Sequence, residues 1–112
     1  MDIESFFEFC HTLHSEITED FPFDSSTLVF RINQKIFAMT NIDNFYGGVN
    51  LKCNPERAIE LRESYVGIVP GYHANKKHWN TVYPNSDVPD DLFKELIQHS
   101  FELVFVKKKI KP

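Results

Sequence analysis

The sequence lacks the features of a membrane or secreted protein. It has no run of about 18 apolar residues, the length that a membrane-spanning helix requires. Its first residues, Met1-Asp2-Ile3-Glu4, are acidic where a signal peptide would be basic. The two cysteines, Cys10 and Cys53, form no CxxC motif, so free buried thiols are expected and a disulfide is the alternative. We therefore expect a cytoplasmic protein that does not contact a membrane.

The sequence also lacks the local motifs of common catalytic sites. There is no GxSxG nucleophile motif, no P-loop and no GxGxxG dinucleotide motif. Cys10 and Cys53 fall on apolar stripes, which indicates core positions rather than nucleophiles. His73 or His78 could act as a general base, but the sequence places no nucleophile or orienting acid beside either one. We therefore expect a protein that is not an enzyme and needs no cofactor.

Metal-binding motifs are missing as well. His11 and His14 are three residues apart and could share a helix face, with Glu8 and Glu16 nearby. No HExxH or EF-hand pattern accompanies them. Because zinc requires three or four arranged ligands, we expect no metal site.

Phenylalanine is the residue that the sequence has in unusual abundance. There are 11 Phe among 112 residues, and 42% of the residues are hydrophobic. This content argues against disorder and suffices for a core in a chain of this length. The length fits one domain, so we expect a single domain over residues 1–112.

Charge is distributed unevenly along the chain. Residues 1–30 contain seven acidic residues and no Lys or Arg, whereas the remainder contains 12 basic and 9 acidic residues. The formal net charge is −4 and the pI is about 5.7. A globally basic nucleic-acid binder would have a pI above about 9. Any contact with a nucleic acid must therefore come from a local basic patch.

Hydrophobic periodicity and turn residues predict an alternation of helices and strands. A first helix is expected from Ile3 to Ile17, with Asp2 as its N-cap, because apolar residues recur three and four positions apart. Two strands, Thr27–Ile32 and Lys35–Thr40, flank a hairpin turn at Asn33-Gln34.

In the second half of the chain, the same kinds of pattern predict further strands and two more helices. The remaining strands and extended segments are expected at Val49–Cys53, Val66–Val69 and His78–Tyr83. Asn54-Pro55 predicts the start of a helix that ends near Ser64. A last helix is expected from Pro89 to about Val106, with an inward face made of Leu92, Phe93, Leu96, Ile97, Ser100 and Leu103. This order predicts an α+β fold, an antiparallel β-sheet with hairpins packed against N-terminal, middle and C-terminal helices.

A second hairpin loop is expected at Asp43–Gly48, and it contains Phe45 and Tyr46. We expect both to be exposed, and because a solvated turn does not need two aromatic rings, a partner contact at this loop is one hypothesis. The hairpins here and at Asn33-Gln34 could equally be dimer contacts, so the oligomeric state stays open.

The densest group of polar and aromatic side chains lies between residues 71 and 81. It consists of Tyr72, His73, Asn75, Lys76, Lys77, His78, Trp79 and Asn80. The lysines can neutralise phosphates, the aromatic rings can stack on bases, and the amides can donate to phosphate oxygens or read base edges. The alternative is structural: Trp79 fills the core, and Asn75 and Asn80 bond to the loop backbone. The lysines of the tail at residues 107–111 are expected to be solvated.

Several short segments of the chain resemble those of a known family in their amino-acid sequence, order and spacing. They are Glu19-Asp20-Phe21-Pro22-Phe23, Thr27-Leu28-Val29-Phe30, Lys35-Ile36-Phe37-Ala38, the segment from Asn50 to Ala58, and the segment from Pro70 to Val82. These segments resemble the MmcQ/YjbR family of small bacterial proteins over nearly the whole chain. The resemblance implies a fold similar to the frataxin-like α+β arrangement. It also implies a double-wing DNA-binding domain, in which two hairpins flank a grooved sheet.

We therefore expect a non-enzymatic DNA-binding module whose partner is duplex DNA. Its expected contact surface consists of Lys52, Arg57, Tyr72, His73, Asn75, Lys76, Lys77, His78, Trp79 and Asn80, in which Lys52, Lys76 and Lys77 contact phosphates with help from Arg57. The alternative is a protein-interaction or small-anion-binding module on the same surface. A concave aromatic pocket around Trp79 and Tyr72 favours this alternative, and a flat or convex basic ridge favours DNA. A third hypothesis, borrowed from the frataxin-like fold, is that the acidic first helix binds a metal cation.

Overall fold

Among the residues that the structure describes, two of the three α-helices begin at side-chain caps that the sequence supplies. The helices are α1 (Ile3–Thr12), α2 (Pro55–Ser64) and α3 (Asp90–Val104). At the start of α1, the Asp2 carboxylate accepts a hydrogen bond of 2.8 Å from the Ser5 amide. At the start of α2, the Asn54 side chain accepts from the amides of Glu56 and Arg57. Both caps satisfy amides that the first helical turn leaves without a backbone partner.

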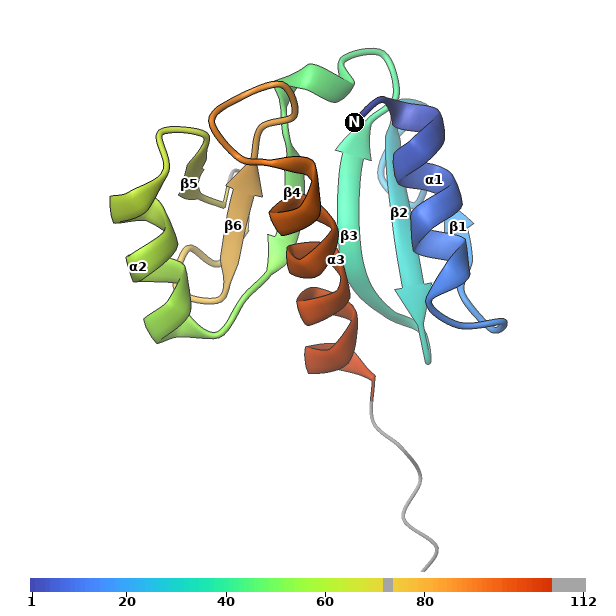
Figure 1. Cartoon of the computed structure of the whole chain (residues 1–112). Coiled ribbons are helices and arrows are strands. Elements are labelled where there is room, and N and C mark those ends of the chain that lie inside the picture. The colour runs from blue at the N-terminus through green and yellow to red at the C-terminus, as the bar shows by residue number, and fades with distance from the viewer. Residues whose placement is uncertain (72–73, 106–112) are drawn as a thin grey trace, which may run out of the picture.

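The strands form one antiparallel sheet. The computed structural model describes residues 1–71 and 74–105. Within these ranges the strands are β1 (Thr18–Asp20), β2 (Thr27–Ile32), β3 (Lys35–Asn41), β4 (Val49–Lys52), β5 (Ile68–Pro70) and β6 (Trp79–Val82). They lie in the order β1-β2-β3-β4-β6-β5. A 3₁₀ turn, η1 (Phe45–Gly47), connects β3 to β4 (Figure 1).

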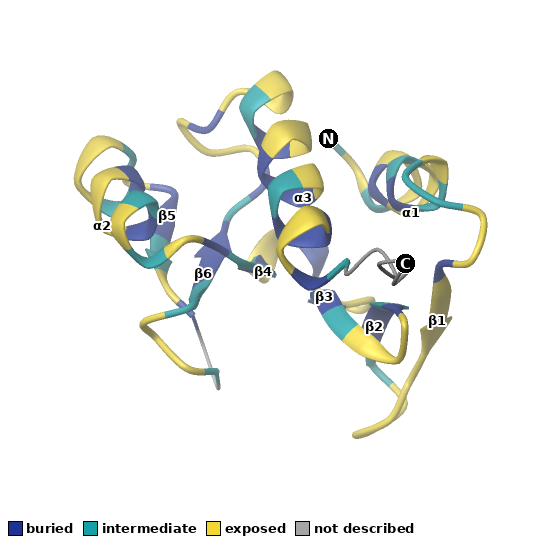
Figure 2. Ribbon diagram, turned by 90° about the horizontal axis from the view of Figure 1, so that it is seen from below, coloured by how far each residue is buried: buried dark blue, intermediate teal, exposed yellow. Residues whose placement is uncertain are grey.

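All three helices lie on the same side of the sheet (Figure 2). Helix α1 packs over β2, where the rings of Phe6 and Phe30 meet edge to face with centroids 5.5 Å apart. Helix α3 contacts β3 and β4, and α2 contacts β5 and β6. The core lies between these two layers, and its largest fully buried side chains include Phe6, Phe30, Phe37 and Phe93. In the described ranges the opposite face of the sheet carries no helix, and it is called the open face below.

Several sequence predictions are confirmed by the structure. The α+β class is correct, and Thr27–Ile32 and the end of α2 at Ser64 match the predicted bounds. Asn33 and Gln34 have φ of +52° and +68°, the left-handed conformation of a tight hairpin turn. Cys10 and Cys53 are free and buried.

As a separate finding, the described ranges contain no helix that is both long and apolar enough to traverse a bilayer.

The first helix is shorter than predicted, because it ends at Thr12 rather than Ile17. Ile17 is buried as expected, but it reaches the core from an irregular segment. In that segment the His14 Nδ1 atom accepts a hydrogen bond of 3.0 Å from the Glu16 amide. The chain then adds Thr18–Asp20 to the sheet as edge strand β1, which the sequence did not predict. Ile17 fits the helical spacing of the apolar residues, and it is also a core residue. The spacing alone therefore could not show whether the helix extends to Ile17 or an irregular segment carries it into the core.

Two predictions about exposure are wrong. Phe45 was expected to be exposed beside Tyr46, but it is 5% exposed and belongs to the core, whereas Tyr46 is 52% exposed. Leu103 was expected to face inward, but it is 41% exposed. The helical period instead continues the buried stripe of α3 through Phe93, Leu96, Ile97, Ser100, Phe101 and Val104.

Candidate functional site

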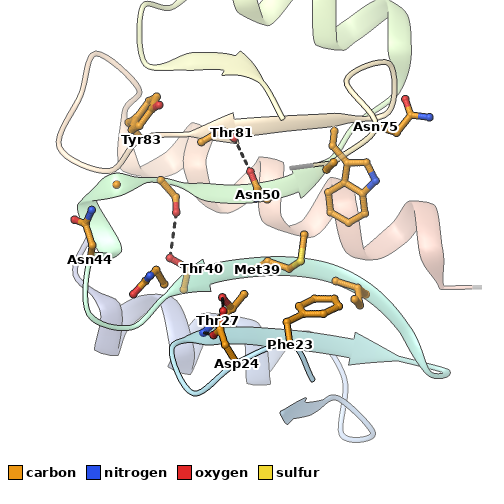
Figure 3. Close-up of a pocket in the computed structure, with 16 residues that line it drawn as sticks. Phe23, Asp24, Thr27, Met39, Thr40, Asn44, Asn50, Asn75, Thr81 and Tyr83 are labelled. Carbon is orange, nitrogen blue, oxygen red and sulfur yellow. Dashed lines mark hydrogen bonds between the residues drawn. The ribbon is translucent and has the colours of Figure 1, made fainter. Parts of the chain in front are cut away.

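The open face of the sheet is hollowed along its centre. Met39 of β3, Asn50 of β4 and Thr81 of β6 are register neighbours, and they form a row across this hollow. Side chains of directly paired residues point to the same face of a sheet. Figure 3 shows this row between Asp24 and Phe23 at one side and Tyr83 at the other. The row is therefore the floor of a groove that crosses the strands.

Helix α3 contributes to the shape of this groove from behind the sheet. The ladder between β3 and β4 is short, running from Ala38–Leu51 to Thr40–Val49. Beyond it, the buried Ser100 hydroxyl donates to the Phe37 carbonyl oxygen and accepts a hydrogen bond of 2.8 Å from the Lys52 amide. The two strands are thus joined there through a helix side chain, which satisfies backbone groups that a continuous ladder would otherwise pair.

The groove has a volume of about 850 Å³, within the range of small-molecule sites. Its lining is aromatic or apolar at Phe23, Ile36, Met39, Trp79 and Tyr83, and it carries amides or hydroxyls at Thr27, Thr40, Asn41, Asn44, Asn50, Asn75 and Thr81. The one Asp, Glu, Lys or Arg among the described lining residues is Asp24. Hydrogen bonds from the amides of Ser26 and Thr27 hold the pKa of the Asp24 carboxyl below its usual value, so this end of the groove is anionic at neutral pH.

The polar side chains of the groove are held in place before any ligand arrives. The Thr81 hydroxyl donates to Asn50 Oδ1, and the Thr40 hydroxyl donates to the Gly48 carbonyl oxygen at 3.1 Å (Figure 3). The Thr27 hydroxyl donates to Asp24 Oδ2 at 3.1 Å. Groups that are already ordered lose little rotamer entropy on binding.

Gly48 shapes the groove through its backbone. Its φ is +116°, a conformation that L side chains rarely adopt, and a Cβ built there would lie 2.5 Å from Thr81 Cγ2. The glycine therefore lets the chain leave η1 and enter β4 directly beside the groove floor.

Arg62 of α2 positions the loop that precedes Trp79, and sequence reasoning did not identify it. Its guanidinium donates to Asn80 Oδ1 at 2.7 Å, to the Trp79 carbonyl oxygen at 3.2 Å and to the Lys76 carbonyl oxygen. Five donors in a fixed fork suit one arginine to this task. In the sequence, Arg62 is visible only as an arginine in the last turn of a helix. A cation at that position is also explained by its favourable interaction with the helix dipole, so nothing pointed to a role in the loop.

Five of the predicted site residues, Trp79 among them, come together at the Trp79 end of the groove. Lys52 pairs directly with Trp79 across β4 and β6. Asn75 lines the groove, and its side chain accepts a hydrogen bond of 2.9 Å from the Lys77 amide, which fixes the turn that carries the exposed residues Lys76 and Lys77. The Lys76 ammonium also donates to the Gly71 carbonyl oxygen at 3.2 Å.

The structure places other predicted residues elsewhere. Asn80 was expected on the same surface as Trp79, but it is 2% exposed and takes the hydrogen bond from Arg62, because it alternates to the opposite face of β6. Arg57 forms an ion pair with Glu95 of α3 and does not line the groove. The half-buried His78 accepts a hydrogen bond from the Cys53 amide through its carbonyl oxygen. Tyr72, His73 and the tail lysines lie outside the described residues.

Lys52, Lys76 and Lys77 have no acidic partner within 4.0 Å in the described part of the chain. The ion pairs found there join the Met1 amino group to Asp90, His11 to Glu19, Arg31 to Asp20, and Arg57 to Glu95. The groove therefore has a cationic end near Trp79 and an anionic end at Asp24.

Comparison with known proteins gives consistent matches. The YjbR family model matches residues 14–103. The uncharacterized protein YbdF of Escherichia coli O157:H7 is 39% identical over 74% of this chain and 68% of its own length. The uncharacterized protein YjbR of E. coli K12 is 33% identical over 64% of this chain, which spans 61% of that relative.

Solved structures resemble nearly the whole chain. The crystal structure of Deinococcus radiodurans protein DR2400, with the domain DUF419, has a TM-score of 0.86 and 39% identity, covering 97% of this chain and 82% of that one. The crystal structure of a Pseudomonas syringae protein has a TM-score of 0.80 and 29% identity, covering 94% of this chain and 100% of that one. The similarity thus includes the sheet, its helices and the strands that line the groove.

Proposed function

The chain belongs to the YjbR family, and we propose that it is a non-enzymatic DNA-binding module that uses the cationic end of the groove. The observation that carries this proposal is the group of three lysines, Lys52, Lys76 and Lys77, around Trp79. Their charges have no acidic partner in the described residues. Such a group attracts phosphates even on a molecule whose net charge is negative, because contacts within about 10 Å dominate at physiological salt.

The experiment is a fluorescence-anisotropy titration of labelled DNA at several salt concentrations. We expect binding that weakens as salt increases, because phosphate contacts release counterions. Changing both Lys76→Ala and Lys77→Ala should weaken binding and reduce the slope of log affinity against log salt by about one unit for each lost contact.

Lys94→Ala is the matched control. Lys94 is an exposed residue of α3 on the helix side of the sheet, so this change removes one charge without touching the groove. An unchanged salt slope in the double variant, or an equal loss per charge in Lys94→Ala, would refute the assignment of the phosphate contacts.

A second candidate function is a protein-interaction or small-ligand-binding module, and the concavity of the open face favours it. The groove holds aromatic side chains and fixed amides, as ligand sites commonly do. The groove is less suited to a small anion, because its described lining residues include no Lys or Arg. Absence of DNA binding at low salt, together with a ligand-induced change in the fluorescence of Trp79, the single tryptophan, would favour this candidate.

A further inference from the structure

We propose that the groove on the open sheet face receives unstacked bases of single-stranded DNA, with Trp79 as a stacking platform. This inference rests on the proposed DNA-binding function and specifies the form of DNA. It is carried by the shape of the groove, its aromatic lining, its fixed amides and the charge difference between its two ends.

The shape of the open face suits a single strand better than a duplex. Reading a duplex requires an element that projects into a DNA groove, such as a helix or a β-ribbon. Here the described helices all lie behind the sheet, and the open face is hollow, with a volume of about 850 Å³. A hollow of this size encloses splayed bases, which protrude from a single strand.

The aromatic lining matches the flat faces of bases. Phe23 is 66% exposed although it is a large apolar side chain, and Trp79 and Tyr83 line the same groove from β6 and the segment after it. Phe23 is largely exposed and Trp79 and Tyr83 are half-buried, and aromatic side chains left open to solvent in one concave site indicate a surface that a partner covers. Bases stack on such rings regardless of sequence.

The polar lining matches the edges of bases. Asn41, Asn44, Asn50 and Asn75 place four amides around the groove, and amides both donate to and accept from base edges. The side-chain oxygens of Asn75 and Asn50 are held in place because they accept hydrogen bonds from the Lys77 amide and the Thr81 hydroxyl, respectively. These two side chains are therefore oriented before a ligand binds, which favours specific recognition of bases over nonspecific binding.

The distribution of charge separates bases from phosphates. The groove interior carries no Lys or Arg among its described lining residues, so bases rather than phosphates fit inside. Lys52, Lys76 and Lys77 flank the Trp79 end, where the backbone phosphates enter. Asp24 repels phosphates from the other end.

The test compares a labelled 12-nucleotide single strand with a duplex of the same sequence, by anisotropy and by quenching of Trp79 fluorescence. We expect the single strand to bind at least about tenfold more tightly and to quench the tryptophan, because stacked bases contact the indole. Phe23→Ala should weaken single-strand binding by about tenfold. Because Phe23 is 66% exposed and outside the core, this change should leave the fold intact, and circular dichroism checks this.

Val66→Ala is the matched control, because Val66 is 89% exposed and does not line the groove. Equal or tighter binding of the duplex, unaffected by Phe23→Ala, would overturn this inference and leave the proposed function standing. Single-strand binding that depends on the lysines but neither quenches Trp79 nor responds to Phe23→Ala would also overturn it. Absence of binding to both forms at low salt would overturn the inference and the proposed function together.

Discussion

At the scale of single residues, the groove depends most directly on Gly48. We predict that Gly48→Ala destabilises the protein by about 1–3 kcal/mol, the usual range for a side chain forced into a left-handed backbone conformation. The added Cβ would also lie 2.5 Å from Thr81 Cγ2 in the groove wall. Urea denaturation followed by circular dichroism measures the loss as a lower midpoint with an unchanged slope.

Gly47→Ala provides the comparison for this prediction. A Cβ at Gly47 would meet the amide end of the Asn44 side chain, at 2.4 Å from Nδ2, and no strained φ applies there. Because the end of a side chain can move aside, the cost should be smaller than at Gly48. Equal losses in the two variants would mean that steric crowding, and not the backbone conformation of Gly48, sets the cost.

At the scale of elements, the sequence predicted those parts of the fold whose signals are local. The Asn33-Gln34 turn and the Asn54-Pro55 helix start depend on residues adjacent in sequence, and both were predicted correctly. Strand β1 was missed because only pairing with β2 makes Thr18–Asp20 a strand. Its three residues are all exposed and carry no alternating apolar pattern.

The candidate site shows the same limit. The dense segment at residues 71–81 contains Trp79 and Asn75, which line the groove. Phe23, Met39 and Asn50 were not selected, because they come from separate strands and loops that only the sheet brings together. A groove on a sheet face is a product of register, and register is not readable from one strand alone.

The junction of α2 and α3 gives a prediction about pH. The His99 Nε2 atom of α3 accepts a hydrogen bond of 3.1 Å from the amide of Asn54, the N-cap of α2. Burial, and then the charge of Arg57, hold the pKa of His99 below its ordinary value of 6.5, with opposing contributions from Glu95 and Glu102. A protonated Nε2 cannot accept this hydrogen bond. The folded state therefore binds fewer protons than the unfolded state, so stability is present above the unfolded pKa and falls as pH drops below about 6.5.

We expect urea denaturation to give a lower free energy of unfolding at pH 5.5 than at pH 7.5, and His99→Gln to reduce this difference. His78→Gln is the control, because it also removes one histidine but leaves the α2–α3 junction intact. A pH dependence that is the same in His99→Gln as in the unchanged protein would show that His99 does not couple these helices to pH.

At the scale of the whole molecule, the fold places the acidic N-terminal segment and the lysines that precede β6 at opposite ends of the sheet. The acid-rich first 30 residues form α1 and β1, which lie at the β1–β2 end of the sheet. The turn that carries Lys76 and Lys77 precedes β6, at the opposite end beside β5. Figure 1 shows α1 and β1 on one side of the molecule and β6 on the other. A protein of net negative charge can thus present a cationic region, because screening limits the reach of the distant acids.

The two buried thiols test whether this molecule unfolds as one unit. Cys10 of α1 and Cys53, after β4, are 0% and 3% exposed and belong to the same core cluster, although they lie toward different ends of the sheet. Burial raises the pKa of both thiols, so neither forms the reactive thiolate readily in the folded state. If residues 1–112 make one cooperative domain, as the sequence predicts, both thiols should become reactive through the same global opening.

We therefore expect iodoacetamide labelling, read by mass spectrometry across a urea series, to modify Cys10 and Cys53 with the same midpoint, equal to that of circular dichroism. Labelling in full denaturant corrects for any intrinsic difference between the two thiols. Earlier labelling of Cys53 would mean that α2, β5 and β6 open separately from the rest. Since Arg62 of α2 holds the loop before Trp79, that result would also make the Trp79 end of the groove the part most easily reshaped by a ligand.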